Sequence, residues 1–452
     1  MSVDRDQTVT RNEQNTPYET GTDMHFEVTQ SSVGGSIWIT TSKSHTLRAV
    51  LLASLGNGIS HVRHILPSPD TDAMIRACSA FGATIVRDGT DLRITGFAGT
   101  PSIPRQIIDV GNSGQVLRFG AAISALIPHY SVFTGDESIR SLRPMTPLLD
   151  ALRQLGAFAE SSKGDGYAPV IIKGPIHAGH VVMDGQDSQP VSAMLMLAAY
   201  LEGETTLEVR EAGEKPWINL TLHWLDRMGV GYENRKYEVY TVYGRRGGGK
   251  FSPFDYTVPG DWSSAAFPLA AALLCNCELT LENMDIQDPQ GDKAILDIFR
   301  AMGAVIDVDV SGKKVMVRQH DGLRGITVDV NAVIDAVPML AALACFAQSP
   351  TTIIGAAIAR HKESDRLTAI ATELAAMGGR IEEFDDGLTV YPTALHGARV
   401  DSRHDHRIAM ALAVAALRCG DTIVENTDCV TKSFPGFATS MAGIGAAITE
   451  KI

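Results

Sequence analysis

The chain has 452 residues, is 44% hydrophobic and 20% charged, and carries a formal net charge of −13 at pH 7. At roughly 150 residues per domain, this length predicts two or three domains. The acidic balance argues against general nucleic-acid binding, which needs a basic face, but local clusters of Lys and Arg can still bind small anions.

The chain opens with a polar segment, residues 1–24, which lacks the apolar stretch of a secretory signal and is interpreted as a tail. No run of about 18 apolar residues follows without polar interruption, so no membrane-spanning helix is expected. The cysteines lie mostly in apolar runs, which is typical of reduced thiols in a cytoplasmic protein. Cys275 and Cys277 have no second pair of ligands nearby, so no metal site is expected.

Six segments then share one pattern: small polar residues, an Ala- and Leu-rich helix, a turn and a β-prone run. They begin at Ser42, Gly111, Asp187, Gly260, Asn331 and His404. A second helix ending near a glycine follows in each segment, as in MIRACSAFGA and LLDALRQLGA. Self-similarity at a period of roughly 70 residues predicts two domains of three units each.

Nucleotide-binding motifs are missing from this pattern. Neither a GxxxxGK[ST] loop nor a GxGxxG turn that opens a helix after a strand occurs. The glycine-rich GRRGGGK stretch that begins at Gly244 has no helix after it and is interpreted as a hairpin loop.

Polar residues stand at the start of each apolar first helix. Six helix N-termini facing one cleft would form an anion site through free N–H groups and helix dipoles. The same residues are also ordinary N-caps, which need no ligand. The cations beside them favour the anion site, and they are Lys43, Arg48, Arg118, Arg143, Lys362, Arg366, Arg407 and Lys432. A buried guanidinium without a partner is costly, so this cluster predicts a cleft for phosphate and carboxylate groups.

Carboxylates lie among these cations at Asp335, Glu363 and Asp405. A carboxylate held beside cations can transfer a proton when substrate closes the site. Glu363 and Asp365, in the stretch RHKESDRL, are explained equally well as salt-bridge partners of the neighbouring Lys and Arg. Spacing alone leaves both interpretations open.

Several motifs in chain order resemble those of the 5-enolpyruvylshikimate-3-phosphate synthase family of enolpyruvyl transferases. They are SKSHTLR, GNSG, TGDE…RP, SQ…SA, GDWSSA, IDAVP, KESDRL, DHRIAM and TKSFP. The resemblance implies an α/β fold of six βαβαββ repeats, three per domain, arranged as an inside-out α/β barrel. We expect one domain at 42–256 and a discontinuous one at 25–41 plus 257–452, closing over ligands between them.

The resemblance also implies a reaction. The enolpyruvyl group of phosphoenolpyruvate would pass to a hydroxyl of a small acceptor, nominally shikimate 3-phosphate, with release of phosphate and without a cofactor. Lys43 and Glu363 would protonate the methylene carbon, and Asp335 would take the proton of the acceptor hydroxyl. Residues expected to bind phosphoenolpyruvate are Lys43, Gly114, Arg143, Gln189, Arg366, Arg407 and Lys432. Preorganised cations would stabilise the leaving phosphate.

The acceptor half departs from the family pattern. The acceptor residues implied by the resemblance are Ser44, Arg48, Asp187, Ser188, Gln189, Glu214, Trp217, Asp335 and Lys362. Asp187 and Glu214 stand where the family has serines near the acceptor phosphate, and Gln115 and Ile358 also differ from it. Like charges about 4 Å apart repel by several kcal/mol in a partly buried site. Either the enzyme is a standard one with shifted loops, or its acceptor carries hydroxyl or amine groups in place of that phosphate.

Two other hypotheses are weaker. A UDP-N-acetylglucosamine enolpyruvyl transferase usually carries a cysteine in its second unit, but none lies between Cys78 and Cys275. A ligand-binding protein that has lost activity would be expected to lose the predicted catalytic groups, and all of them are present. We therefore expect an enzyme that binds two small molecules, works as a monomer or weak oligomer, and binds neither nucleic acid nor membrane.

Overall fold

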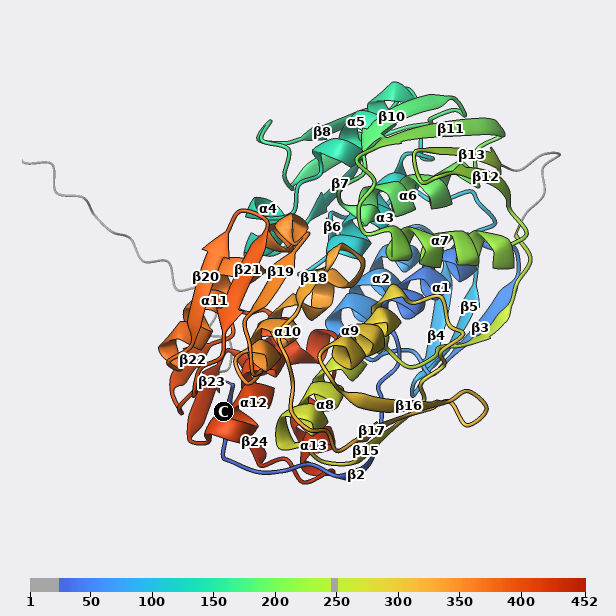
Figure 1. Cartoon of the computed structure of the whole chain (residues 1–452). Coiled ribbons are helices and arrows are strands. Elements are labelled where there is room, and N and C mark those ends of the chain that lie inside the picture. Colours follow the sequence, from blue (N-terminus) through green and yellow to red (C-terminus); the bar gives the residue numbers. More distant parts are fainter. Residues whose placement is uncertain (1–23, 245–250) are drawn as a thin grey trace, which may run out of the picture.

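The computed structural model describes residues 24–244 and 251–452 (Figure 1). The predicted tail and the glycine-rich stretch after Gly244 therefore lie, except for Met24 and Gly244 themselves, outside the described residues. The described strands form six four-stranded sheets, each with two open edges. No β-sheet in this part of the chain closes into a barrel. In the same residues, no helix combines the length and the apolar character needed to cross a bilayer.

The third unit along the chain shows the repeat most simply. It contains β10 (His180–Asp184), α6 (Ser188–Ala198), β11 (Gly203–Arg210), α7 (Lys215–Arg227), β12 (Gly231–Arg235) and β13 (Val239–Gly244). Strands β10 and β11 are parallel, while β13 pairs antiparallel with both β11 and β12. Parallel strands need a crossover connection, which α6 supplies. The predicted βαβαββ unit is confirmed.

Two other units follow the same order, and a third follows it once an N-terminal strand is added. One contains β6 (Ile108–Asp109), α3 (Gly114–Ser124), β7 (Ser131–Thr134), α4 (Glu137–Ser141), α5 (Thr146–Gln154), β8 (Phe158–Ser161) and β9 (Val170–Lys173). Another contains β18 (Thr327–Asp329), η2 (Asn331–Ala336), α10 (Val337–Ala344), β19 (Thr351–Ile354), η3 (Ala357–His361), α11 (Arg366–Ala376), β20 (Arg380–Phe384) and β21 (Gly387–Tyr391). The last contains β22 (Arg399–Asp401), α12 (His406–Cys419), β23 (Thr422–Glu425), η4 (Thr427–Lys432), α13 (Phe437–Ala442) and β24 (Ile448–Lys451), and the N-terminal strand β1 (His25–Val28) completes its sheet.

The remaining two units exchange a strand. One comprises α1 (Lys43–Leu55), β3 (Ile59–Arg63), α2 (Pro69–Ala80), β4 (Thr84–Asp88) and β5 (Asp91–Thr95), and the distant strand β14 (Asp255–Thr257) joins it parallel to β3. The other comprises α8 (Trp262–Cys275), β15 (Leu279–Glu282), η1 (Gly291–Ala294), α9 (Ile295–Ala301), β16 (Val305–Asp309) and β17 (Lys314–Arg318), and β2 (Gly35–Trp38) joins it parallel to β15. An isolated bridge between Thr41 and Gly260 holds the two connecting segments side by side.

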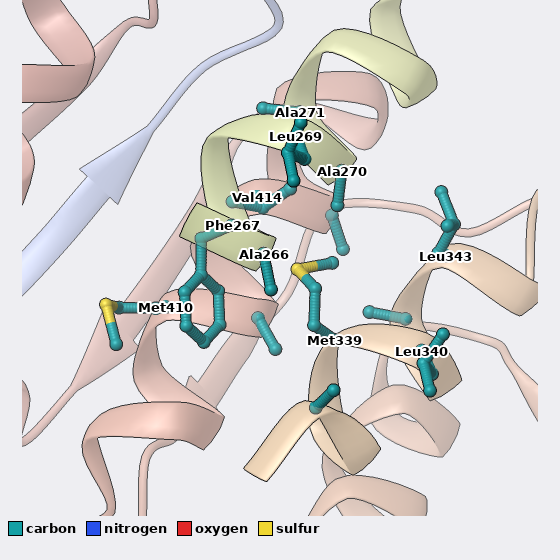
Figure 2. Packing of buried hydrophobic residues seen from close by; sticks show 14 of the residues in the cluster. Ala266, Phe267, Leu269, Ala270, Ala271, Met339, Leu340, Leu343, Met410 and Val414 are labelled. Carbon is teal, nitrogen blue, oxygen red and sulfur yellow. The ribbon is translucent and has the colours of Figure 1, made fainter. Parts of the chain in front are cut away.

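Two hydrophobic clusters form the interior. One runs from Leu47 to Val258, and the other combines residues 26–39 with residues 262–448. Figure 2 shows part of the second cluster, where side chains of α8, α10 and α12 meet. These helices are buried on all sides, as the sequence predicts for helices that are apolar nearly all round. Apart from Val258, which packs in the first cluster, the clusters fall on either side of the expected boundaries, and the domain division itself stays a prediction.

The polar starts of the first helices are mostly N-caps. The side chains that accept a hydrogen bond from a backbone N–H in the first turn are Ser42, Ser113, Asp187, Asp261 and Asp405. The start of α10 differs, because no side chain caps it and the 3-10 turn η2 precedes it. Pro338 lies in the first turn of α10 and has no N–H to donate, so the regular helix begins at Val337 and not at Asn331.

Candidate active site

A polar pocket lies where the first turns of several of these helices meet. The predicted site residues that line it are Lys43, Ser44, Arg48, Gly114, Arg143, Ser188, Gln189, Glu214, Trp217, Asp335, Lys362, Glu363, Arg366 and Lys432. They come from both hydrophobic halves of the chain. The structure therefore brings together residues almost 390 positions apart, such as Lys43 and Lys432. Their individual roles remain predictions.

Two predicted residues are set back from the lining. The carboxylate of Asp187 caps α6 by accepting from the backbone N–H of Gln189 at 3.0 Å, and it pairs with Arg118 at 3.1 Å. Arg407 pairs with Asp335, which does line the pocket, at 3.3 Å between Nη2 and Oδ2. In this structure both residues reach the pocket through a neighbour.

Glu363 is the centre of the cation cluster. Its Oε1 lies 3.0 Å from Arg143 Nη2 and 2.7 Å from Lys432 Nζ, and its Oε2 accepts from Arg366 Nη2 at 2.7 Å. Burial by itself would raise the pKa of this carboxyl, but the three cations hold the pKa well below its ordinary value. Glu363 is therefore ionised in the protein without ligands.

The two carboxylates of the KESDRL motif have different environments. Asp365 caps α11 and pairs with Arg360 at 2.9 Å, on the outside of the pocket. Glu363, only two residues earlier, points its carboxylate at the pocket cations. The salt-bridge interpretation therefore describes Asp365, while Glu363 is placed where it can meet a ligand.

Asp335 is the second ionised carboxylate of the pocket. Its Oδ1 accepts from Arg366 Nη1 at 2.7 Å, and its Oδ2 lies 3.3 Å from Arg407 Nη2. Burial raises its pKa, but Arg407 and Arg366 outweigh burial and lower the pKa below its ordinary value. An ionised carboxylate accepts hydrogen bonds only, so Asp335 can receive a hydroxyl proton in a bond with a ligand.

Some buried guanidinium groups have unused donors. Within the described part of the chain, Arg143 Nε and both Nε and Nη1 of Arg407 find no hydrogen-bond partner, although these residues are only 3% and 2% exposed. Leaving a buried charged donor unpaired costs free energy. A ligand rich in anionic oxygens would satisfy such donors, because Arg binds phosphate and carboxylate groups through paired N–H bonds.

Arg48 lines the part of the pocket next to Ser44. Its Nε donates to Thr221 Oγ1 at 3.0 Å and its Nη1 to the carbonyl of Ser44 at 3.2 Å. No carboxylate in the described ranges pairs with it, and burial lowers its pKa to about 9. A buried cation with only neutral partners favours an anionic ligand group at this end.

Sequence patterns missed some residues that line the pocket. Asp70 lies in the first turn of α2 and pairs with Lys43 at 3.5 Å between Oδ2 and Nζ. His406 is buried at the start of α12, and neither of its ring nitrogens finds a hydrogen-bond partner within residues 24–244 and 251–452. Burial is the main reason why the pKa of His406 lies well below its ordinary value, so the ring is neutral. The only signal for His406 was its place between Asp405 and Arg407.

The ligand atoms of Glu363, Asp405 and His406 lie within 4.8 Å of one another, a spacing that a metal ion could bridge. The environment does not suit one. Arg366 already binds both carboxylates, with its Nε 2.8 Å from Asp405 Oδ2 and its Nη2 2.7 Å from Glu363 Oε2. A metal ion there would have to compete with these fixed positive charges.

Asp292 is a buried carboxyl beside the pocket. It accepts a hydrogen bond from Ser263, and burial, with Asp335 nearby, raises its pKa to about 8.

A carboxyl whose pKa is raised on folding stabilises the fold fully below its unfolded pKa, and this contribution is lost as pH rises towards 8. As the pH rises from 6 to 8, the free energy of unfolding of Asp292→Asn should therefore increase relative to that of the wild type by up to about 1.4 kcal/mol per pH unit. Urea denaturation of both proteins measures the difference, and parallel pH profiles would contradict the prediction.

The fold of six units and the cation-lined pocket are those of an enolpyruvyl transferase. The chain belongs to the EPSP synthase (3-phosphoshikimate 1-carboxyvinyltransferase) family, whose model matches residues 28–441. The resemblance seen in the motifs, the fold class and the enzyme class are thus confirmed.

Named relatives agree with this assignment. A 3-phosphoshikimate 1-carboxyvinyltransferase of Ruminiclostridium cellulolyticum is 39% identical over 426 residues, which cover 94% of this chain and 99% of the relative. The protein of that name from Chlamydia trachomatis serovar D is 41% identical over 407 residues, 89% of this chain and 90% of the relative.

Solved structures show the same architecture. EPSP synthase from Acinetobacter baumannii matches with a TM-score of 0.79 at 26% identity, covering 95% of this chain and 100% of that one. The enolpyruvyl transferase NikO from Streptomyces tendae matches with a TM-score of 0.76 at 19% identity, covering 95% and 99%. At that identity, the likeness to NikO concerns the fold alone.

Proposed function

We propose that the protein transfers the enolpyruvyl group of phosphoenolpyruvate to a hydroxyl of shikimate 3-phosphate and releases phosphate. The observation that carries the proposal is the cluster of Arg143, Arg366 and Lys432 around Glu363, with buried guanidinium donors still unused. Phosphoenolpyruvate carries a phosphate and a carboxylate, which these donors fit. The names of the relatives support 3-phosphoshikimate, which is shikimate 3-phosphate, as the acceptor.

The proposed steps use the carboxylates and Lys43. Asp335 takes the proton of the acceptor hydroxyl while the hydroxyl oxygen bonds to C2 of phosphoenolpyruvate. In the same step, C3 of phosphoenolpyruvate gains a proton. The resulting tetrahedral intermediate then loses a proton from C3 and expels phosphate, which restores the double bond. Burial, with Lys432 and Arg407 nearby, lowers the pKa of Lys43 although Asp70 raises it, so the ammonium gives up its proton more readily.

In this proposal, binding of phosphoenolpyruvate enables Glu363 to transfer a proton. Without ligands, three cations keep its pKa low. The anionic oxygens of phosphoenolpyruvate compete for the same cations, so its binding raises the pKa of Glu363 towards the range useful for proton transfer.

Phosphate release from phosphoenolpyruvate by the purified protein tests the proposal. Release that depends on added shikimate 3-phosphate is the expected result. If phosphoenolpyruvate binds but no phosphate appears with this acceptor, the assigned acceptor is wrong. We further propose that the protein acts as a monomer or weak oligomer in the cytoplasm and binds no nucleic acid.

A second candidate differs only in the acceptor. The carboxylate of Glu214 lies inside the pocket, where it favours an acceptor that presents hydroxyl or amine groups in place of the phosphate. Shikimate without its phosphate, tested in the same assay, separates the two candidates.

A further inference from the structure

The carboxylate of Glu214 occupies an anion-binding position that the rest of the pocket builds. Its Oε2 accepts from the backbone N–H of Ser188 at 3.0 Å and from the Ser188 hydroxyl at 2.9 Å. Its Oε1 accepts from Lys362 Nζ at 2.7 Å. Glu214 is only 1% exposed, so these three bonds account for its charge in place of water. We call the donors of Ser188 and Lys362 the anion cradle.

The cradle would hold a ligand anion if Glu214 were elsewhere. It combines the first turn of α6 with a lysine, and both belong to the lining of the pocket. Burial lowers the pKa of Lys362, but Glu214 and Asp187 outweigh burial and raise it, so the lysine stays charged. Helix N-termini and buried cations both attract anions. The chain's own carboxylate therefore occupies donors that suit a phosphate.

Neighbouring contacts hold Glu214 in this position although its backbone conformation is unfavourable. Its φ of 43° and ψ of 39° are left-handed, a region that non-glycine residues enter at a cost of about 1–2 kcal/mol. Its backbone N–H donates at 2.9 Å to Oδ1 of Asn331, which belongs to the unit that contains β18 and α10. A Cβ on the preceding Gly213 would come within 2.6 Å of the carbonyl oxygen of Gln186, which fixes the path of the turn. Strained residues held by such contacts cluster at ligand sites and switches.

We propose that Glu214 is an internal competitor for the anionic group of the acceptor and thereby sets acceptor specificity. A phosphate can accept from Ser188 only when the carboxylate leaves these donors or loses its charge, because the backbone N–H and the hydroxyl of Ser188 each carry a single hydrogen. The inference rests on the proposed function, since it assigns the acceptor to this end of the pocket.

Glu214→Gly and Glu214→Gln test the inference in binding experiments with 3-phosphoshikimate and shikimate. Glycine suits a φ of 43° and empties the cradle, while glutamine removes only the charge. We expect Glu214→Gly to bind 3-phosphoshikimate about tenfold or more tighter than the wild type, a change of ~1.4 kcal/mol. Affinity for shikimate should not rise, because the gain belongs to the phosphate. Glu214→Gln should show a smaller gain in the same direction.

Glu211→Gln is the matched control. Glu211 belongs to the same turn but is exposed, and among the described residues its side chain bonds only to Gln186, at 2.7 Å, so its loss of charge should change neither affinity. If both Glu214 variants still bind phosphoenolpyruvate but bind 3-phosphoshikimate no tighter than the wild type, the inference is wrong. A gain that appears equally for shikimate would also overturn it.

Failure of the proposed function would look different. In that case neither the wild type nor the variants would release phosphate from phosphoenolpyruvate with 3-phosphoshikimate, whatever their affinities. The ratio of the affinities for the two ligands still tests Glu214 under those conditions, because it needs no turnover.

Discussion

Replacing Lys432 by alanine is expected to weaken phosphoenolpyruvate binding by about ten- to a hundredfold, which corresponds to a charged hydrogen bond of ~1.5–3 kcal/mol. Lys432 Nζ lies 2.7 Å from Glu363 Oε1 and 2.8 Å from the carbonyl oxygen of Asn112. The substitution removes a cation from the cluster and also a link between η4 and the start of α3. Calorimetric titration with phosphoenolpyruvate measures the change.

Lys314→Ala gives a control for the loss of a lysine. Lys314 pairs with Glu282 at 2.9 Å in a partly exposed ion pair away from the pocket, and such pairs contribute little to stability. This variant should bind phosphoenolpyruvate like the wild type. A folded Lys432→Ala protein with unchanged affinity would show that the ligand phosphate does not lie at this cluster.

The repeat pattern allowed the units to be predicted because each first helix is apolar and carries its own N-cap. The caps at Ser42 and Asp405 are local features, in which a side chain bonds to a backbone N–H two or three residues later. Such signals need no knowledge of the fold. The start of α10 was predicted less well, because Pro338 forces a 3-10 turn before the regular helix.

The pairing of charges could not be predicted from sequence. Glu363 and Asp365 are two residues apart, but Glu363 lies in the loop before α11 and meets the pocket cations, whereas Asp365 caps that helix. Asp70 was missed because its partner, Lys43, comes from another helix. Likewise, the exchange of β2 and β14 between units depends on pairings with strands far along the chain.

Glu214, at the proposed acceptor end of the pocket, is a third example of a charge whose partners could not be predicted from sequence. The sequence placed Glu214 near the expected phosphate but did not predict Ser188 and Lys362 as the partners of its carboxylate. The structure shows that Ser188 and Lys362 already bind the carboxylate. In our proposal Glu214 therefore acts on a phosphate in two ways: it repels the phosphate, and it competes with it for these donors. The competition depends on the left-handed turn that brings Glu214 to α6.

Glu363→Gln is expected to lower turnover by about a hundredfold or more, in the range of general acid–base catalysis. Glutamine keeps the size of the side chain and can still accept from Arg366, but it cannot exchange a proton. Affinity for phosphoenolpyruvate should fall less than turnover, or even rise, because Arg143 and Lys432 lose a competing carboxylate. Steady-state kinetics together with calorimetry separate the two effects.

Asp365→Asn is the matched control, since it changes a carboxylate of the same motif to an amide. It should leave turnover unchanged, and because Asn is also a good N-cap, stability should change by less than about 1 kcal/mol. If Glu363→Gln binds phosphoenolpyruvate and keeps wild-type turnover, proton delivery to C3 cannot depend on this carboxylate. Lys43 would then be the donor, because it is the remaining predicted proton donor that lines the pocket and burial already lowers its pKa.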